Sequence, residues 1–244
     1  MMLLIRKRSA LTLGVCVCVL LLCGVSLQKG ITFQSLPAFA ASGAPEQPVT
    51  VVIDPGHGGE DGGAVSPDGV KESTINLAVS LRLEELLRFA GVPTEMTRRT
   101  DEMVCDPDLS TMRQRKVSDI HNRVAMVNDT PGAVLLSIHQ NSLPSSTVTH
   151  GAQAFWNRQV GAETLAEGMQ TELNTVVNTH RAKEPKPIAE DIYLLNHVTA
   201  PAVLVECGFL SNEGETALLQ TPAHQTILAA VIAAGCLRWA AENG

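Results

Sequence analysis

Residues 49–59 of this chain are Val-Thr-Val-Val-Ile-Asp-Pro-Gly-His-Gly-Gly. The first five form a short β-branched run typical of a buried strand, and Asp-Pro-Gly ends that run. His57 follows in a glycine-rich turn, where backbone without Cβ atoms can bend sharply and leave room for a ligand. The stretch therefore predicts a strand that delivers a histidine to its carboxyl end.

Three more short segments carry a carboxylate or an imidazole in a comparable context. Glu72 lies at the start of an apolar pattern with helical period. His139 directly follows the apolar run 133–138, and Glu206 ends the run that begins at Ala202. Since ligands gather outside the carboxyl ends of strands in sheets of this class, we expect these side chains to converge with His57.

Apolar runs and helical patterns alternate along the chain. This alternation predicts a single α/β domain with a mostly parallel, twisted sheet and helices on both faces. Ser73 or Thr74 is expected to cap the first helix, and Gly91 to follow its end. We predict strands at 49–53, 92–97, 133–138, 151–156 and 202–205, helices at 73–90, 118–127, 162–177 and 222–241, and an irregular loop over 98–116.

The first forty residues have the pattern of an export segment. Arg6, Lys7 and Arg8 precede an uncharged apolar stretch from Ala10 to Leu27, and a small-residue site ends at Ala40. The stretch is also about long enough to span a bilayer, which needs roughly 18 to 20 residues. We therefore expect residues 1–40 to be an export signal or a membrane anchor, residues 41–50 a linker, and residues 51–244 one extracytoplasmic domain, secreted or anchored by its N-terminal segment.

Charge and cysteine content exclude several functions. Residues 44–244 contain 14 Lys and Arg against all 25 Asp and Glu, a formal charge of −11. Such an acidic domain is a poor candidate for binding nucleic acid or an anionic membrane surface. The cysteines of this part, Cys105, Cys207 and Cys236, are too widely spaced for a disulfide framework or a cysteine zinc knuckle.

Each candidate residue also has a structural interpretation. His57 fits a tight turn without function, although neither a dinucleotide fingerprint nor a phosphate-loop lysine follows it. Glu72 suits a helix N-terminus, where an acidic side chain contributes roughly 0.3–1 kcal/mol. His139 resembles many hydrogen-bonded structural histidines. Glu206 is harder to explain in this way, because a carboxylate in a buried strand without a partner costs several kcal/mol.

Together the four residues indicate hydrolytic metal chemistry. Catalytic zinc sites usually offer three protein ligands and keep one position open, and two histidines with one glutamate are a standard set. Zinc makes water reactive at neutral pH, and a separate acidic group then transfers the proton. We therefore predict His57, Glu72 and His139 as zinc ligands and Glu206 as the catalytic proton carrier. The other histidines lack this context and are expected on the surface or in packing roles: 121, 150, 180, 197 and 224.

These segments are identified by their resemblance to a known enzyme family. Asp-Pro-Gly-His-Gly-Gly at 54–59, Lys-Glu at 71–72, Ser-Ile-His-Gln-Asn at 137–141 and Val-Glu-Cys-Gly-Phe-Leu-Ser-Asn at 205–212 resemble the zinc-dependent N-acetylmuramoyl-L-alanine amidases. Those enzymes cut the amide between the lactyl group of muramic acid and L-alanine in peptidoglycan. The resemblance implies a zinc amidase catalytic domain over residues 51–244, with the same ligands and the same catalytic glutamate. Arg123 matches the family's helix before the second histidine.

Further segments resemble the germination-specific amidases of the spore cortex. They are Gly-Ala-Gln-Ala-Phe-Trp at 151–156, Asn-Thr-His-Arg at 178–181 and Pro-Ala-Val-Leu-Val-Glu-Cys-Gly-Phe-Leu-Ser-Asn at 201–212. The resemblance implies a part in muramic δ-lactam formation and germination, on the cortex side of the forespore. A peptidoglycan deacetylase is the partner it implies. An activator protein is a further expected partner, because an acidic domain acting on a polyanionic wall needs help to reach its substrate. The segment after Arg181 is richer in proline and lysine than the family pattern, so no role is assigned to Arg181 or Lys183.

Two other functions share some of these features. A binding protein of the same fold could hold wall glycan without cutting it, but such a protein would typically lack a ligand or the proton carrier. A zinc carboxypeptidase, or an amidase acting on a peptide, would use the same chemistry on another bond. Identification of the cleaved bond separates these enzymes.

Overall fold

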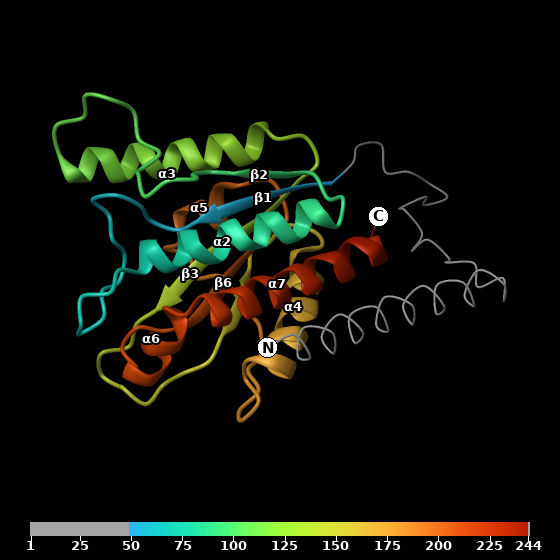
Figure 1. The fold of residues 1–244 in the computed structure, drawn as a ribbon. Coiled ribbons are helices and arrows are strands. Elements are labelled where there is room, and N and C mark those ends of the chain that lie inside the picture. Colours follow the sequence, from blue (N-terminus) through green and yellow to red (C-terminus); the bar gives the residue numbers. More distant parts are fainter. Residues whose placement is uncertain (1–48, 244) are drawn as a thin grey trace, which may run out of the picture. The chain divides into compact units, whose positions relative to one another are not determined.

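Six strands form one sheet in the computed structural model of the protein, which describes residues 49–243 (Figure 1). The expectations for residues 1–40 and for nearly all of the linker lie outside the described residues. Thr50, the last residue assigned to the linker, already belongs to the first strand. The strands are β1 (Thr50–Pro55), β2 (Thr94–Met96), β3 (Ala133–Asn141), β4 (Gln153–Trp156), β5 (Lys186–Pro187) and β6 (Ala202–Phe209).

The strands are ordered β2-β1-β3-β6-β4-β5. β1, β2, β3 and β6 run parallel, whereas β4 is antiparallel to β6 and parallel to β5. The prediction of a mostly parallel α/β sheet is therefore confirmed. Since β1, β3 and β6 are neighbours and point the same way, their carboxyl ends lie together at one edge.

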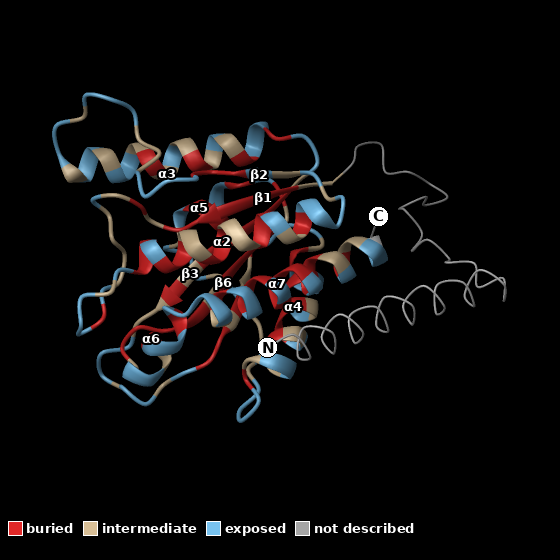
Figure 2. Ribbon diagram, viewed as in Figure 1, coloured by how far each residue is buried: buried red, intermediate tan, exposed pale blue. Residues whose placement is uncertain are grey.

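Helices cover both faces of this sheet (Figures 1 and 2). Alternate residues of each central strand face opposite layers, so Val51 and Ile53 pack toward α2, α4 and α7, while Val52 packs toward α3 and α5. Strands buried on both faces explain the nearly continuous apolar runs in the sequence. The helices are α2 (Glu72–Phe89), α3 (Met112–Asp129), α4 (Ala162–Val176), α5 (Tyr193–His197), α6 (Glu213–Leu219) and α7 (Pro222–Asn243).

Several predicted boundaries were wrong. α3 begins at Met112 inside the expected loop, because Thr111 and Gln114 form a reciprocal capping box that starts the helix. α2 begins at Glu72 without a side-chain cap, so the expected cap at Ser73 or Thr74 is absent from this helix. Gly91 does follow the end of α2 with a positive φ of 81°, as predicted. The short elements β5, α5 and α6 were not predicted.

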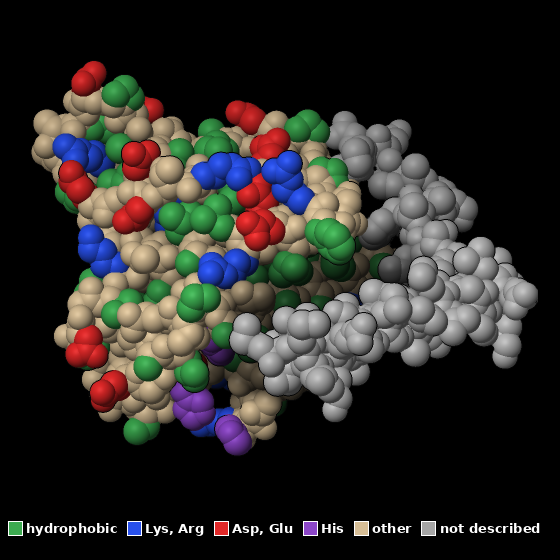
Figure 3. Space-filling view, in the orientation of Figure 1, with side chains coloured by type: hydrophobic (Ala, Val, Ile, Leu, Met, Phe, Trp, Pro, Cys, Tyr) green, Lys and Arg blue, Asp and Glu red, His purple; other side chains and the backbone are tan. Residues whose placement is uncertain are grey.

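Charged side chains of both signs are interspersed on the face that carries α2 (Figure 3). Glu84 of α2, for example, pairs with both Arg88 and Arg99. Within residues 49–243, no single helix combines the length and apolar composition needed to cross a bilayer; α6 and α7 meet that criterion only as a pair bent by 81°. Buried residues of α7, such as Leu228 and Ile232, pack in the core of the domain.

Candidate active site

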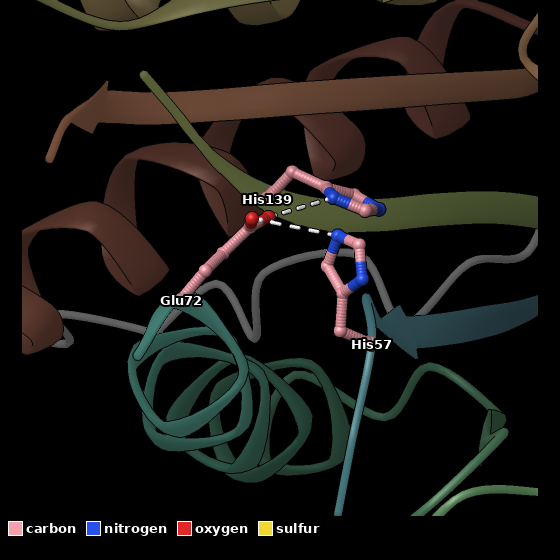
Figure 4. Close-up of side chains that lie close together, drawn as sticks. All are labelled: His57, Glu72 and His139. Carbon is pink, nitrogen blue, oxygen red and sulfur yellow. Dashed lines mark hydrogen bonds and ion pairs between the residues drawn. The ribbon is translucent and has the colours of Figure 1, made fainter. Parts of the chain in front are cut away.

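The side chains of His57, Glu72 and His139 point toward one another at the carboxyl edge of the sheet (Figure 4). His57 Nε2 lies 3.4 Å from Glu72 Oε2, and His139 Nδ1 lies 2.9 Å from Glu72 Oε1. One candidate ligand atom from each residue falls within 4.8 Å of the others. Two imidazoles and one carboxylate at this spacing fit a divalent metal of the zinc type.

Glu72 is positioned by backbone and side-chain donors. Its Oε2 accepts the Ala64 N–H at 2.8 Å, and its Oε1 accepts the Gln140 N–H at 3.1 Å and the Asn76 amide at 3.2 Å. Burial would raise the pKa of Glu72, but the hydrogen bond and charge of His139 outweigh it and lower that pKa to about 2. The carboxylate is therefore fixed and ionised.

Burial lowers the pKa of His139, but Glu72, followed by Glu206 and Asp54, raises it above the ordinary histidine value. A concentration of negative charge that favours a cation therefore surrounds this imidazole.

Asp61 orients His57 from the side opposite to Glu72. Its Oδ2 lies 3.0 Å from His57 Nδ1, and its Oδ1 pairs with Lys116 Nζ at 2.8 Å. Burial would raise the pKa of Asp61, but the His57 and Lys116 contacts lower it. A carboxylate on the second nitrogen of a metal-binding imidazole fixes its tautomer and leaves Nε2 free for the metal. The sequence prediction missed Asp61, although its spacing of four residues from His57 in the glycine-rich turn was visible.

The glycine-rich turn brings backbone unusually close to the candidate metal ligands His139 and Glu72. A Cβ atom at Gly56 would overlap the His139 ring, and one at Gly63 would lie 2.5 Å from Glu72 Oε2. His57 itself has a φ of 61°, in the left-handed region that non-glycine residues rarely occupy. At Gly56 and Gly63 the missing Cβ atom therefore makes room for the His139 and Glu72 side chains; room for a substrate, the role expected from the sequence, stays a prediction.

Two buried arginines hold this strained turn. Arg123 Nη2 donates to the His57 carbonyl at 2.8 Å, and its Nη1 donates to Asp54 Oδ1 at 2.5 Å. Arg98 donates to the Pro55 carbonyl at 2.9 Å and to the Gly56 carbonyl at 3.1 Å. Strain at a functional site persists when the surroundings over-determine it, as they do here. The sequence placed Arg98 in an irregular loop and gave it no role.

Glu206 lies on the neighbouring strand, directly opposite His139 in the β3–β6 pairing. Its Oε2 is buried and has no hydrogen-bond partner among the described residues. Burial raises the pKa of this carboxyl to about 7; His139 opposes the rise, the charge of Glu72 adds to it, and Lys183 opposes it. A carboxyl with this pKa can both take and return a proton near neutral pH.

The structure thus brings all four predicted site residues into one cleft of about 470 Å³. The helix α5 contributes Tyr193 and Leu194 to the lining of this cleft. Of the remaining histidines, 121, 150, 180 and 197 are exposed and 224 is half-buried, in agreement with the expectation for them.

A family model described as N-acetylmuramoyl-L-alanine amidase matches residues 51–238. The chain belongs to this family. Its resemblance in the four short segments is therefore confirmed over most of the domain, and with it the enzyme class of an amide hydrolase.

Several known amidases are similar to this chain in sequence or in structure. The chain is 36% identical over 197 residues to the germination-specific N-acetylmuramoyl-L-alanine amidase of Bacillus subtilis (strain 168), covering 80% of this chain and 81% of that one. It resembles the CwlD amidase of Clostridioides difficile, solved in complex with the GerS lipoprotein, at a TM-score of 0.76 and 34% identity, covering 80% and 99%. An N-acetylmuramoyl-L-alanine amidase of Clostridium difficile 630 matches at a TM-score of 0.69 and 26% identity, covering 81% and 99%.

Proposed function

We propose that this amidase hydrolyses the bond between N-acetylmuramic acid and L-alanine in peptidoglycan, with zinc held by His57, Glu72 and His139. The observation that carries the proposal is the convergence of these three side chains with Glu206 in one cleft. Asp61 supports it, because a carboxylate behind a histidine ligand is a recurring feature of zinc sites. A protein that only binds glycan would have no need of the complete set.

The protein's own residues supply positioning and proton transfer. Zinc, when bound, supplies Lewis-acid activation of water and of the scissile carbonyl. Glu206 acts as the general base that takes a proton from the attacking water, since its carboxyl lies opposite His139 with a buried oxygen that has no partner among the described residues. The same carboxyl then returns the proton to the nitrogen of the departing L-alanine. Arg98 and Arg123 keep the turn of His57 in place throughout.

We further propose a role in the spore cortex. The germination-specific relative and the CwlD-like structure support this narrower assignment. A peptidoglycan deacetylase acting in the same pathway would then complete muramic δ-lactam formation. The co-structure of the CwlD amidase with a lipoprotein supports an activator protein as a partner of this chain too. Residues 1–40 would export or anchor the protein. Residues 41–50 would link this segment to residues 51–244, which would form the catalytic domain outside the cytoplasm.

The test is to incubate the purified protein with cortex-type peptidoglycan, with and without a chelator, and with and without a muramic acid deacetylase. Mass spectrometry should find released stem peptides that begin with L-alanine, and chelation should abolish them. Muramic δ-lactam should form only when the deacetylase is also present. Release of peptides without δ-lactam in the paired reaction would retain the amidase and refute the cortex role.

A further inference from the structure

Glu206 and Phe209 of β6 lie on the same face of the sheet. They are three residues apart, a spacing that in a regular strand would place them on opposite faces. Glu206 pairs with His139 of β3, and Phe209 pairs with Asn141, with a bulge between the two pairs. His139 and Asn141 are two residues apart on one strand and therefore face the same side, as do their partners. Phe209 consequently lies on the face of the sheet that carries Glu206, just beyond the residues that line the cleft.

The strand β4 contributes to this same region from the side away from the zinc-binding residues. Its residue Gln153 pairs directly with Glu206 in the β4–β6 ladder. The Gln153 side chain donates to the Glu184 carbonyl at 2.7 Å. This bond ties the segment after α4 to the strand beside Glu206.

Lys183, the preceding residue, is held in this segment by its backbone. Asn174 of α4 accepts the Lys183 N–H at 3.0 Å and donates to the Lys183 carbonyl at 2.8 Å. The Lys183 ammonium lies 4.7 Å from the centre of the Phe209 ring and donates to the Gly151 carbonyl at 2.5 Å. A long and normally mobile side chain is thereby fixed over Phe209, on the face of the sheet that carries Glu206.

The ammonium of Lys183 forms no ion pair with a carboxylate among residues 49–243, although the charges of Glu215 and Glu206 act on it from a greater distance. The oxygens of Glu215 accept the N–H groups of Gly151 and Phe209. An ammonium group has three donors, and Gly151 takes one of them. The side chain is half-buried, so it is partly accessible to a ligand.

The negative charge of the domain makes a local cation important for binding an anionic substrate. Residues 44–244 have a formal charge of −11, which repels an anionic substrate. The segment 181–186 has three basic residues against one acidic residue. A local cation beside Glu206 therefore offers the kind of contact that an acidic peptide needs.

We propose that Lys183 binds a carboxylate of the stem peptide and so positions the substrate beside Glu206. The proposal rests on the proposed amidase function and assigns the peptide side of the cleft to the region over Phe209. Lys183 is a specificity-determining residue in this account, since it contacts substrate but takes no part in proton transfer.

The test compares two soluble glycan strands, one with free carboxylates on its stem peptides and one with the same carboxylates converted to amides. Wild-type chain, Lys183→Met, Lys183→Arg and the control Lys186→Met are assayed on both. Methionine keeps the alkyl contact with Phe209 and removes the charge. Lys186 is exposed in the same segment, so its replacement controls for net charge.

For Lys183→Met we expect KM on the free-carboxylate strand to rise about tenfold, which corresponds to about 1.4 kcal/mol, with kcat within twofold. KM on the amidated strand should change less than twofold, Lys183→Arg should keep most of the wild-type preference, and Lys186→Met should behave as wild type. Because each variant is compared with itself on two substrates, partial loss of folded protein cancels.

An equal rise of KM on both strands would show a purely structural lysine and overturn the proposal, as would no change on either strand. Failure of the wild-type chain to cut either strand would instead refute the amidase function on which the proposal rests.

Discussion

Glu206→Gln should stabilise the metal-free protein, and only at high pH. Folding raises the pKa of this carboxyl from 4.5 to about 7, so its ionisation costs free energy in the folded state. Above pH 7 this cost lowers the free energy of unfolding by about 3 kcal/mol, since a pKa difference of one corresponds to about 1.4 kcal/mol. Glutamine keeps the shape of the side chain and removes the charge, so the variant loses this penalty.

The sign follows from proton binding. Between pH 4.5 and 7 the unfolded state has released the proton and the folded state retains it, so wild-type stability falls as pH rises through this window. At pH 5 the two proteins should therefore unfold at similar temperatures. At pH 8 Glu206→Gln should unfold about 8 °C higher, since 1 kcal/mol moves the midpoint by roughly 2–4 °C in a domain of this size.

The assay is thermal unfolding followed by circular dichroism, with chelator present at both pH values. Glu167→Gln, at an exposed position of α4, is the matched control and should change the midpoint by less than about 1 °C, because surface substitutions rarely exceed 0.5 kcal/mol. An equal midpoint for wild type and Glu206→Gln at pH 8, or the same gain at pH 5, would refute an uncompensated buried carboxyl at this position.

Three further predictions concern the groups that support the proposed zinc ligands. Arg123→Met leaves Asp54 and Asp119 buried without their cation and should cost about 3–5 kcal/mol in urea unfolding, whereas Arg113→Met at an exposed position of the same helix should cost less than about 0.5 kcal/mol. Burial would raise the pKa of Asp54, but Arg123 and two hydroxyl donors lower it to about 2, so the stabilisation by its charge is complete above pH 4 and is lost as pH falls toward 2. The difference in unfolding free energy between wild type and Asp54→Asn should therefore narrow by about 2 kcal/mol from pH 4 to pH 2. A difference that stays constant over this range would contradict the role of the Asp54 charge. Asp61→Ala frees the His57 ring and should weaken zinc binding about 10- to 100-fold in a competition titration, with Asp68→Ala as the exposed control; unchanged affinity would mean that Asp61 does not orient the ligand.

Much of this architecture was predictable from local patterns. Strands buried on both faces have continuous apolar runs, so β1, β3 and β6 could be recognised, and the rule that parallel strand ends collect ligands placed His57, His139 and Glu206 together. The start of α3 was missed, although the sequence Thr-x-x-Gln at 111–114 is a capping-box pattern, because the first turn has no apolar period.

The supporting groups could not be predicted because they depend on long-range geometry. Arg98 and Arg123 reach carbonyls of the His57 turn across separations of 42 to 68 residues, and nothing local in the sequence marks an arginine as buried. Lys183 is similar, since its place over Phe209 depends on Asn174 and on the bulge in β6.

The most direct test of the central claim measures zinc content and product together for wild type and Glu206→Gln. Both proteins should bind about one zinc ion per chain, as expected for a three-ligand site that Glu206 does not join. Wild type alone should release peptides beginning with L-alanine from purified peptidoglycan. Release at the wild-type rate by Glu206→Gln, or loss of zinc from that variant, would contradict the division into three ligands and one proton carrier.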